Sequence, residues 1–113
     1  TQTTEAQRAV FKKAYAAGVT LLYGTDAAVL PHTMGGWQFA TMIEHGMTPM
    51  EAILSATSVA ADHLRIDADV GAVIPGRQAD IIAVKVDPLT DPLSLRDVDV
   101  VIQAGIVVKQ PPL

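Results

Sequence analysis

Apolar residues recur at helical spacing near the beginning of the chain. Over residues 4–17, alanine and valine return every three or four positions, with basic residues between them. This spacing predicts an amphipathic helix, and Gly18 is suited to end it. The almost wholly apolar run 19–23 follows. Such a run is typical of a strand that is buried on both faces of a parallel sheet.

Two further helices are predicted before residue 66. Residues 27–36 have the composition of a loop, and the first of the two helices covers residues 37–45. The second begins sharply, because Thr48 and Glu51 can form a capping box around a proline at the first helical position. Its helical spacing predicts a buried stripe of Met50, Ile53, Leu54, Thr57, Ala61 and Leu64.

The hydrophobic pattern changes after residue 65. Short apolar runs bounded by glycine and proline predict strands at 70–74, 81–86, 98–103 and 106–109. The chain therefore divides into a helix–strand–helix part, residues 1–65, and a β-rich part, residues 66–113. A lone parallel strand needs neighbours on both sides, so we expect the chain to be a piece of a larger α/β fold.

Composition narrows the possible functions. Of the 113 residues, 50% are hydrophobic, the formal net charge is −4, and the eight Lys and Arg residues are scattered, which argues against a nucleic-acid partner. The absence of cysteine excludes disulfides and thiolate zinc sites, and it fits a cytoplasmic location. No apolar run approaches ~18 residues, so no membrane association is expected, and the first five residues do not resemble a signal peptide.

Asp26 is the sharpest candidate for chemistry. It directly follows the predicted buried strand, and in α/β barrels the carboxyl ends of the strands carry the active site. An aspartate in this position can also simply cap the following loop, because Asp favours turns. Position alone leaves both interpretations open.

Five segments, in order along the chain, carry a resemblance to a known family. They are LYGTD at 22–26, EHGMTPMEAI at 44–53, ATSVAA at 56–61, VGAVIPGRQADI at 70–81 and VIQAGIVV at 101–108. Together they resemble the C-terminal part of the metal-dependent amidohydrolase superfamily, in its imidazolonepropionase-like and Xaa-Pro dipeptidase-like branch. The resemblance spans roughly residues 1–109.

The resemblance implies an α/β fold in which residues 1–65 form the last strand and helices of a (β/α)8 TIM barrel. Residues 66–113 would belong to a small β-sandwich. The implied activity is hydrolysis of C–N bonds in a small-molecule amide, cyclic amide or dipeptide. Asp26 would bind a divalent metal, by default zinc, and would move protons to and from a water whose pKa the metal lowers to about 7.

The other metal ligands of that family have no counterpart in this chain. His32, His45 and His63 are the only histidines, and the latter two are placed on predicted helices, near their C-terminal ends. The resemblance suggests that His32 lines the substrate pocket, with an ordinary surface-loop histidine as the alternative. One carboxylate cannot complete a zinc site, so we expect the chain alone to be inactive.

A second hypothesis is a non-catalytic folded fragment. Its incomplete barrel edge would then recruit partners, either another copy of the chain in a homo-oligomer or the missing barrel part. Gly35 and Gly36 are interpreted as flexible positions before a helix, and Trp37, Phe39 and Met42 as core or lid contacts.

Overall fold

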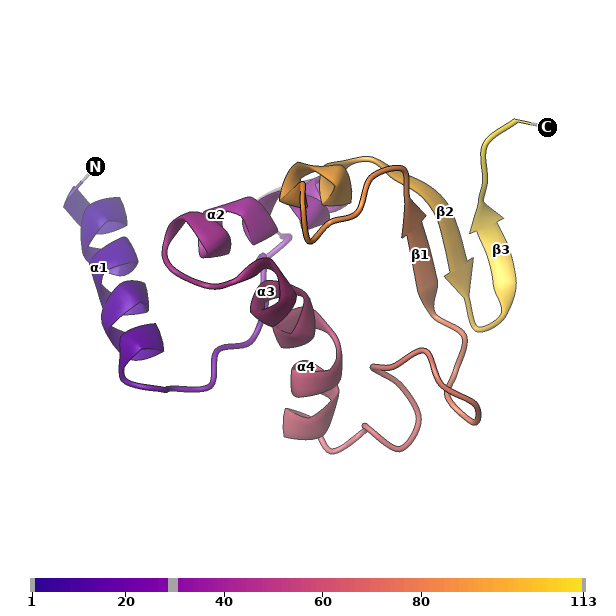
Figure 1. Cartoon of the computed structure of the whole chain (residues 1–113), viewed down its shortest axis with the longest axis horizontal. Helices are drawn as coiled ribbons and strands as arrows, with labels where there is room; N and C mark the ends of the chain where they lie inside the picture. Colours follow the sequence, from indigo (N-terminus) through magenta and orange to yellow (C-terminus); the bar gives the residue numbers. More distant parts are fainter. Residues whose placement is uncertain (1, 29–30, 113) are drawn as a thin grey trace.

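A computed structural model describes residues 2–28 and 31–112. It shows an α/β fold in which helices α1–α4 precede a three-stranded antiparallel sheet. In Figure 1, α1 and the sheet lie at opposite ends of the molecule, with α2, α3 and α4 between them. The helices are α1 (Gln2–Ala16), η1 (His32–Trp37), α2 (Gln38–Glu44), α3 (Pro49–Ala56), α4 (Ser58–His63) and η2 (Pro92–Arg96). The strands are β1 (Ile81–Val84), β2 (Val98–Gln103) and β3 (Ile106–Lys109).

The segment after α1 is not a strand, so the strand predicted at 19–23 is wrong for this chain. A strand exists only through hydrogen bonds to a neighbour, and no described strand lies beside this segment. It is tied to helices instead. Val19 donates its backbone N–H to the carbonyl of Ala14 at 3.0 Å, and Tyr23 donates to the carbonyl of Ser55 at 3.1 Å.

The capping box at the start of α3 is confirmed. The backbone N–H of Glu51 donates to the Thr48 hydroxyl at 3.2 Å, and the Thr48 N–H donates to the Glu51 carboxylate at 2.8 Å. The predicted single helix is interrupted at Thr57, whose φ of −127° and ψ of −101° are not helical. The Thr57 hydroxyl donates to the carbonyl of Ile53 at 2.8 Å, and such back-bonding bends helices.

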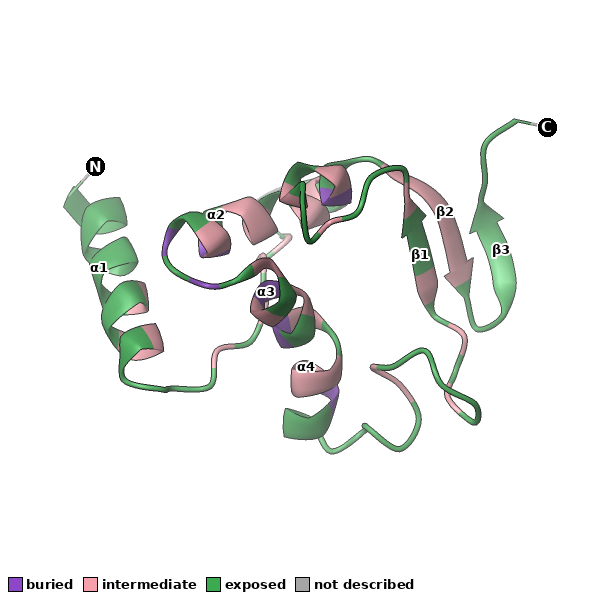
Figure 2. Ribbon diagram, in the orientation of Figure 1, coloured by how far each residue is buried: buried purple, intermediate pink, exposed green. Residues whose placement is uncertain are grey.

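The core lies among α2, α3 and α4, where Figure 2 shows most of the buried surface. Its apolar members among the described residues are two alanines and three larger side chains. Of the predicted stripe, Ala61 is buried, Ile53 is half-buried and the other four residues are exposed. Leu64, for example, is 63% exposed. The buried residues are Met42, His45, Met47, Ala52, Ser55, Ala61 and Leu95.

The sheet has the strand order β1-β2-β3, with Ile81 opposite Ile102 and Gln103 opposite Ile106. The strands predicted at 98–103 and 106–109 are confirmed, and β1 ends two residues before the predicted residue 86. The turn between β2 and β3 uses Ala104 and Gly105 at φ of 49° and 80°, which is the pattern of a two-residue hairpin turn.

Residues 70–74 were predicted as a strand and form bends instead. They lack a ladder partner among the described residues, and this loop is held against the helices. A Cβ on Gly71 would lie 2.6 Å from the Cβ of Ala61 in α4. The loop closes on itself where the N–H of Gln78 donates to the carbonyl of Asp69 at 2.7 Å.

In the part of the chain that the structure describes, no helix has both the length and the apolar character needed to cross a membrane. The assignments of residues 1–65 to a barrel and of 66–113 to a β-sandwich stay predictions.

Candidate functional site

Asp26 lies at the end of the extended segment, residues 19–26, which follows α1. Its side chain is exposed to solvent. Its φ is 48°, in the left-handed region that aspartate tolerates better than most residues. The carboxylate has no hydrogen bond or ion pair with any residue in the ranges 2–28 and 31–112. No described residue therefore occupies either carboxylate oxygen.

Tyr23 fixes the segment that carries Asp26. Its hydroxyl donates to the carbonyl of Gly35 and accepts the backbone N–H of Gln38 at 3.2 Å. Its ring stacks on Phe39, with centroids 4.2 Å apart. Burial raises the pKa of the Tyr23 phenol above its ordinary value, while the hydrogen bond from Gln38 opposes that shift. The phenol thus stays protonated and keeps the hydrogen bond to Gly35.

His32 is the first residue of η1 and is exposed. It makes no hydrogen bond or ion pair with another described residue. Val29 and Leu30, which separate it from Asp26 in the loop, lie outside the described residues. The role of His32 in a substrate pocket stays a prediction.

A hollow of about 330 Å³ adjoins the end of the extended segment. Thr25 and Ala27, which flank Asp26, form part of its wall, but Asp26 and His32 do not. Trp37 and Arg96 face each other here, with the guanidinium carbon of Arg96 4.4 Å from the ring centroid of Trp37. This cation–π contact joins η1 to η2, two segments that are far apart in the sequence.

The described residues do not fit a metal ion by themselves. No group of three or more His, Cys, Asp or Glu side chains is close enough to bind one within the described ranges, whereas a catalytic zinc site uses three protein ligands. His45 and His63 form no such group with Asp26 in the described part of the chain. His45 is buried at the end of α2, and His63 closes α4, in agreement with their predicted positions near helix ends.

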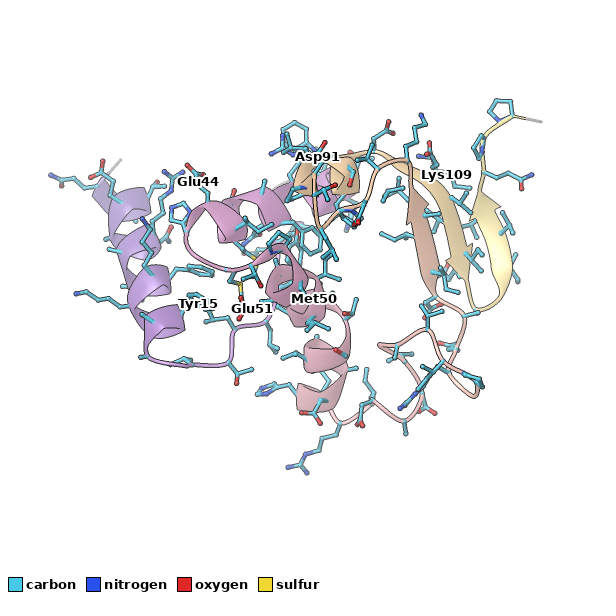
Figure 3. All side chains as sticks on the ribbon, viewed as in Figure 1. Tyr15, Glu44, Met50, Glu51, Asp91 and Lys109 are labelled. Atoms are coloured by element: carbon cyan, nitrogen blue, oxygen red, sulfur yellow. The ribbon has the colours of Figure 1, made fainter. Side chains whose placement is uncertain are left out.

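Two long-range contacts of the structure were not predicted from the sequence. Glu51 accepts a hydrogen bond from the Tyr15 hydroxyl at 2.7 Å, and Figure 3 shows these side chains from α1 and α3 pointing toward one another. Gly36 touches η2, because a Cβ there would overlap the carbonyl oxygen of Leu95. Gly36 is therefore a close-packing position and not merely a flexible one. No local sequence signal identifies either partner.

The Tyr15–Glu51 contact shifts both pKa values. The hydrogen bond to Glu51 raises the pKa of the Tyr15 phenol above its ordinary value. The hydrogen bonds that Glu51 accepts, first from the Thr48 backbone and then from Tyr15, lower the pKa of its carboxyl group. The charged carboxylate is thus the form that holds α1 against α3.

Comparison with known proteins defines the class. The profile of the Amidohydrolase family matches residues 2–109. The chain is 40% identical over 82 residues to an ochratoxinase of Aspergillus niger, covering 72% of this chain and 17% of that protein. It is 35% identical over 68 residues to an adenine deaminase of Paracoccus denitrificans, covering 60% and 10% respectively.

Solved structures of hydrolases are also similar to this chain. A Xaa-Pro dipeptidase with bound methionine in its active site superposes with a TM-score of 0.86 at 43% identity, over 90% of this chain and 25% of that one. Molinate hydrolase superposes with a TM-score of 0.73 at 28% identity, over 87% and 25%. The chain belongs to the Amidohydrolase family, as the resemblance indicated, and it spans about a quarter of the length of these solved relatives.

Proposed function

We propose that this chain is the part of a metal-dependent hydrolase of C–N bonds that supplies one catalytic carboxylate, Asp26. The substrate class is a small amide, cyclic amide or dipeptide. The observation that carries the proposal is an exposed carboxylate without a partner among the described residues, held at the end of a segment that Tyr23 anchors. It occurs in a chain whose relatives include a dipeptidase and a deaminase.

Asp26 would contribute one metal ligand and accept a proton. The remaining ligands would come from outside the described residues, because the described ones form no cluster of three. The divalent metal, by default zinc, would activate water when bound. His32 would line the substrate pocket. The cytoplasmic location stays a prediction that rests on the absence of cysteine.

The test compares Asp26→Asn with Asp67→Asn in the complete enzyme. Asparagine keeps the size of the side chain but cannot accept the proton at neutral pH, so we expect kcat to fall by roughly 10²–10⁴-fold. Asp67 is an exposed turn residue, and its variant should keep the activity. Hydrolysis of Xaa-Pro dipeptides and N-acyl amino acids is the measurement. An Asp26→Asn enzyme within about 10-fold of the parent would remove Asp26 from the mechanism.

A second candidate function is association of this chain with another copy or with a separate barrel-forming chain. The favouring observation is a set of exposed apolar residues on the extended segment and on the edge strand β3. Val19 is 54% exposed and Ile106 is 67% exposed, and uncovered edges recruit strands. Sedimentation of the 113-residue chain would show an oligomer on this hypothesis, and a monomer at all concentrations would contradict it.

A further inference from the structure

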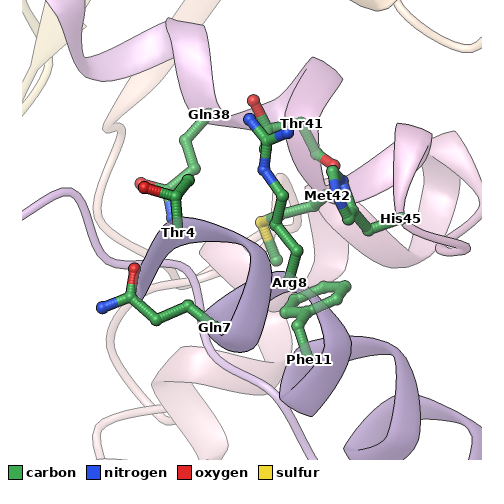
Figure 4. A pocket seen from close by; sticks show the side chains of 8 residues that line it. All are labelled: Thr4, Gln7, Arg8, Phe11, Gln38, Thr41, Met42 and His45. Carbon is green, nitrogen blue, oxygen red and sulfur yellow. The ribbon is translucent and has the colours of Figure 1, made fainter. Parts of the chain in front are cut away.

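A second hollow, of about 280 Å³, lies between α1 and α2. Arg8 and Phe11 from α1 and Met42 and His45 from α2 and its C-terminal end surround it, as Figure 4 shows. It contains neither Asp26 nor the residues that flank Asp26. The wall combines an apolar floor with a few polar groups, which is the usual make-up of a small-molecule site.

His45 is the buried polar group of this hollow. Its side chain is only 8% exposed, and its Nδ1 lies 2.7 Å from the carbonyl oxygen of Thr41. A carbonyl oxygen can only accept, so Nδ1 carries the proton and donates. In the neutral ring, Nε2 is then an acceptor. It has no partner among the described residues, and a ligand with an N–H group could satisfy it.

Arg8 supplies the charge. Its guanidinium forms no salt bridge with an acidic residue of the described ranges, so its fork of donors is available to a carboxylate. Phe11 packs edge-on to His45, with ring centroids 6.4 Å apart. Together with Met42 it offers an apolar surface beside the two polar groups.

We propose that this hollow binds an N-acyl amino acid. The carboxylate would pair with Arg8, the amide N–H would donate to Nε2 of His45, and an apolar side chain would lie on Phe11 and Met42. This ligand class joins an anion, an N–H donor and an apolar group at the spacing of one amino acid. The inference concerns a site separate from Asp26, so it holds whether or not Asp26 acts in catalysis.

The test is a calorimetric titration of the 113-residue chain with N-acetyl-L-phenylalanine. We expect a Kd near ~1 mM, since a small exposed site offers few contacts. N-acetyl-L-phenylalanine amide lacks the charge and should bind at least about 10-fold more weakly. 3-Phenylpropanoate keeps the charge and the ring but lacks the N–H, and it should bind several-fold more weakly because one hydrogen bond is lost.

Variants locate the site. Arg8→Gln should weaken binding of N-acetyl-L-phenylalanine by about 10-fold or more, whereas Arg65→Gln, which removes an exposed arginine elsewhere, should leave the Kd within about 2-fold. Circular dichroism checks that both variants are folded. Equal binding of the acid and its amide, an equal effect of the two variants, or no binding at 10 mM, about ten times the expected Kd, would each overturn the proposal. None of these results depends on turnover, so they leave the proposed hydrolase function untouched.

Discussion

The helices α2–α4 and the sheet β1–β3 differ in how far their apolar side chains are buried. The helical region buries both small residues, such as Ala52 at 0% exposed, and large ones, such as Met42 at 4%. In the sheet region all four residues of β3 are exposed, and Ile82 in β1 is 52% exposed. Burial of apolar surface is the main source of folding free energy. The helical region therefore has buried apolar residues of its own, whereas β1, β2 and β3 include none, so the sheet depends more on the segments that connect it to the helices.

Close contacts join η1 and α4 to the segments on either side of β1. Gly36 of η1 lies against the Leu95 carbonyl, Gly71 lies against α4, and Arg96 stacks on Trp37. Two of these three contacts require a residue without a side chain. Interfaces of this kind tolerate no added volume, so they are where the difference between the two regions can be tested.

The largest effect is expected for Gly36→Ala. The new Cβ would overlap the Leu95 carbonyl oxygen, so η1 and η2 must separate, at a cost of ~3 kcal/mol. Gly35→Ala is the matched control, because nothing lies within 4 Å of a Cβ there. Urea unfolding followed by the fluorescence of Trp37, the single tryptophan, measures both. If the two variants unfold at the same urea concentration, the close approach is not important for stability.

A smaller effect is expected for Gly71→Ala, compared with Gly76→Ala. Both glycines have φ near +90°, so both variants share a strain of ~1–2 kcal/mol in that backbone region. Only Gly71 faces a neighbour, since its Cβ would lie 2.6 Å from that of Ala61. The overpacking should add about 1–2 kcal/mol. Unfolding curves for the pair isolate this difference, and equal curves would show that the 66–79 loop can move off α4 at no cost.

Local signals in the sequence predicted some features well. The capping box of Thr48 and Glu51 and the turn at Ala104-Gly105 depend on residues within a few positions of each other. The runs 19–23 and 70–74 have strand-like composition, but strands need a partner that the same run does not contain. The pattern therefore identified apolar segments without determining what they pair with.

In the candidate site, too, one residue could be predicted from the sequence and another could not. Asp26 stood out because of its place after an apolar run, and the resemblance to the family, which the comparisons confirm, implied a role that stays a prediction. Tyr23, which anchors that segment through Gly35 and Gln38, could not be identified from the sequence. Its partners are 12 and 15 positions away, and no periodic pattern links an aromatic hydroxyl to a distant backbone.

A stabilising change is expected in the sheet region. Ala104 has φ of 49°, which costs an L-residue ~1–2 kcal/mol, and glycine relieves that strain at some entropic cost. Ala104→Gly should therefore raise the free energy of unfolding by ~0.5–1 kcal/mol. The N–H of residue 104, which donates to the Asp80 carboxylate at 2.8 Å, is retained. Chemical denaturation gives the value, and a destabilised variant would show that this turn is unstrained.

The smallest effect concerns α1, which has no buried residue among its described positions. Because hydrogen bonds lower the pKa of Glu51, its contribution to stability is present above its unfolded pKa of ~4.3. That contribution is lost as the pH falls through the lower, folded pKa. Tyr15→Phe removes one of the causes and leaves the capping box intact, so the folded pKa of Glu51 should move up toward the ordinary value. NMR titration of the Glu51 carboxyl carbon measures the shift.

Tyr23→Phe, which removes a hydroxyl group bonded elsewhere, is the control. An unchanged Glu51 titration in Tyr15→Phe would mean that the capping box alone sets this pKa and that α1 is not held to α3 by the carboxylate.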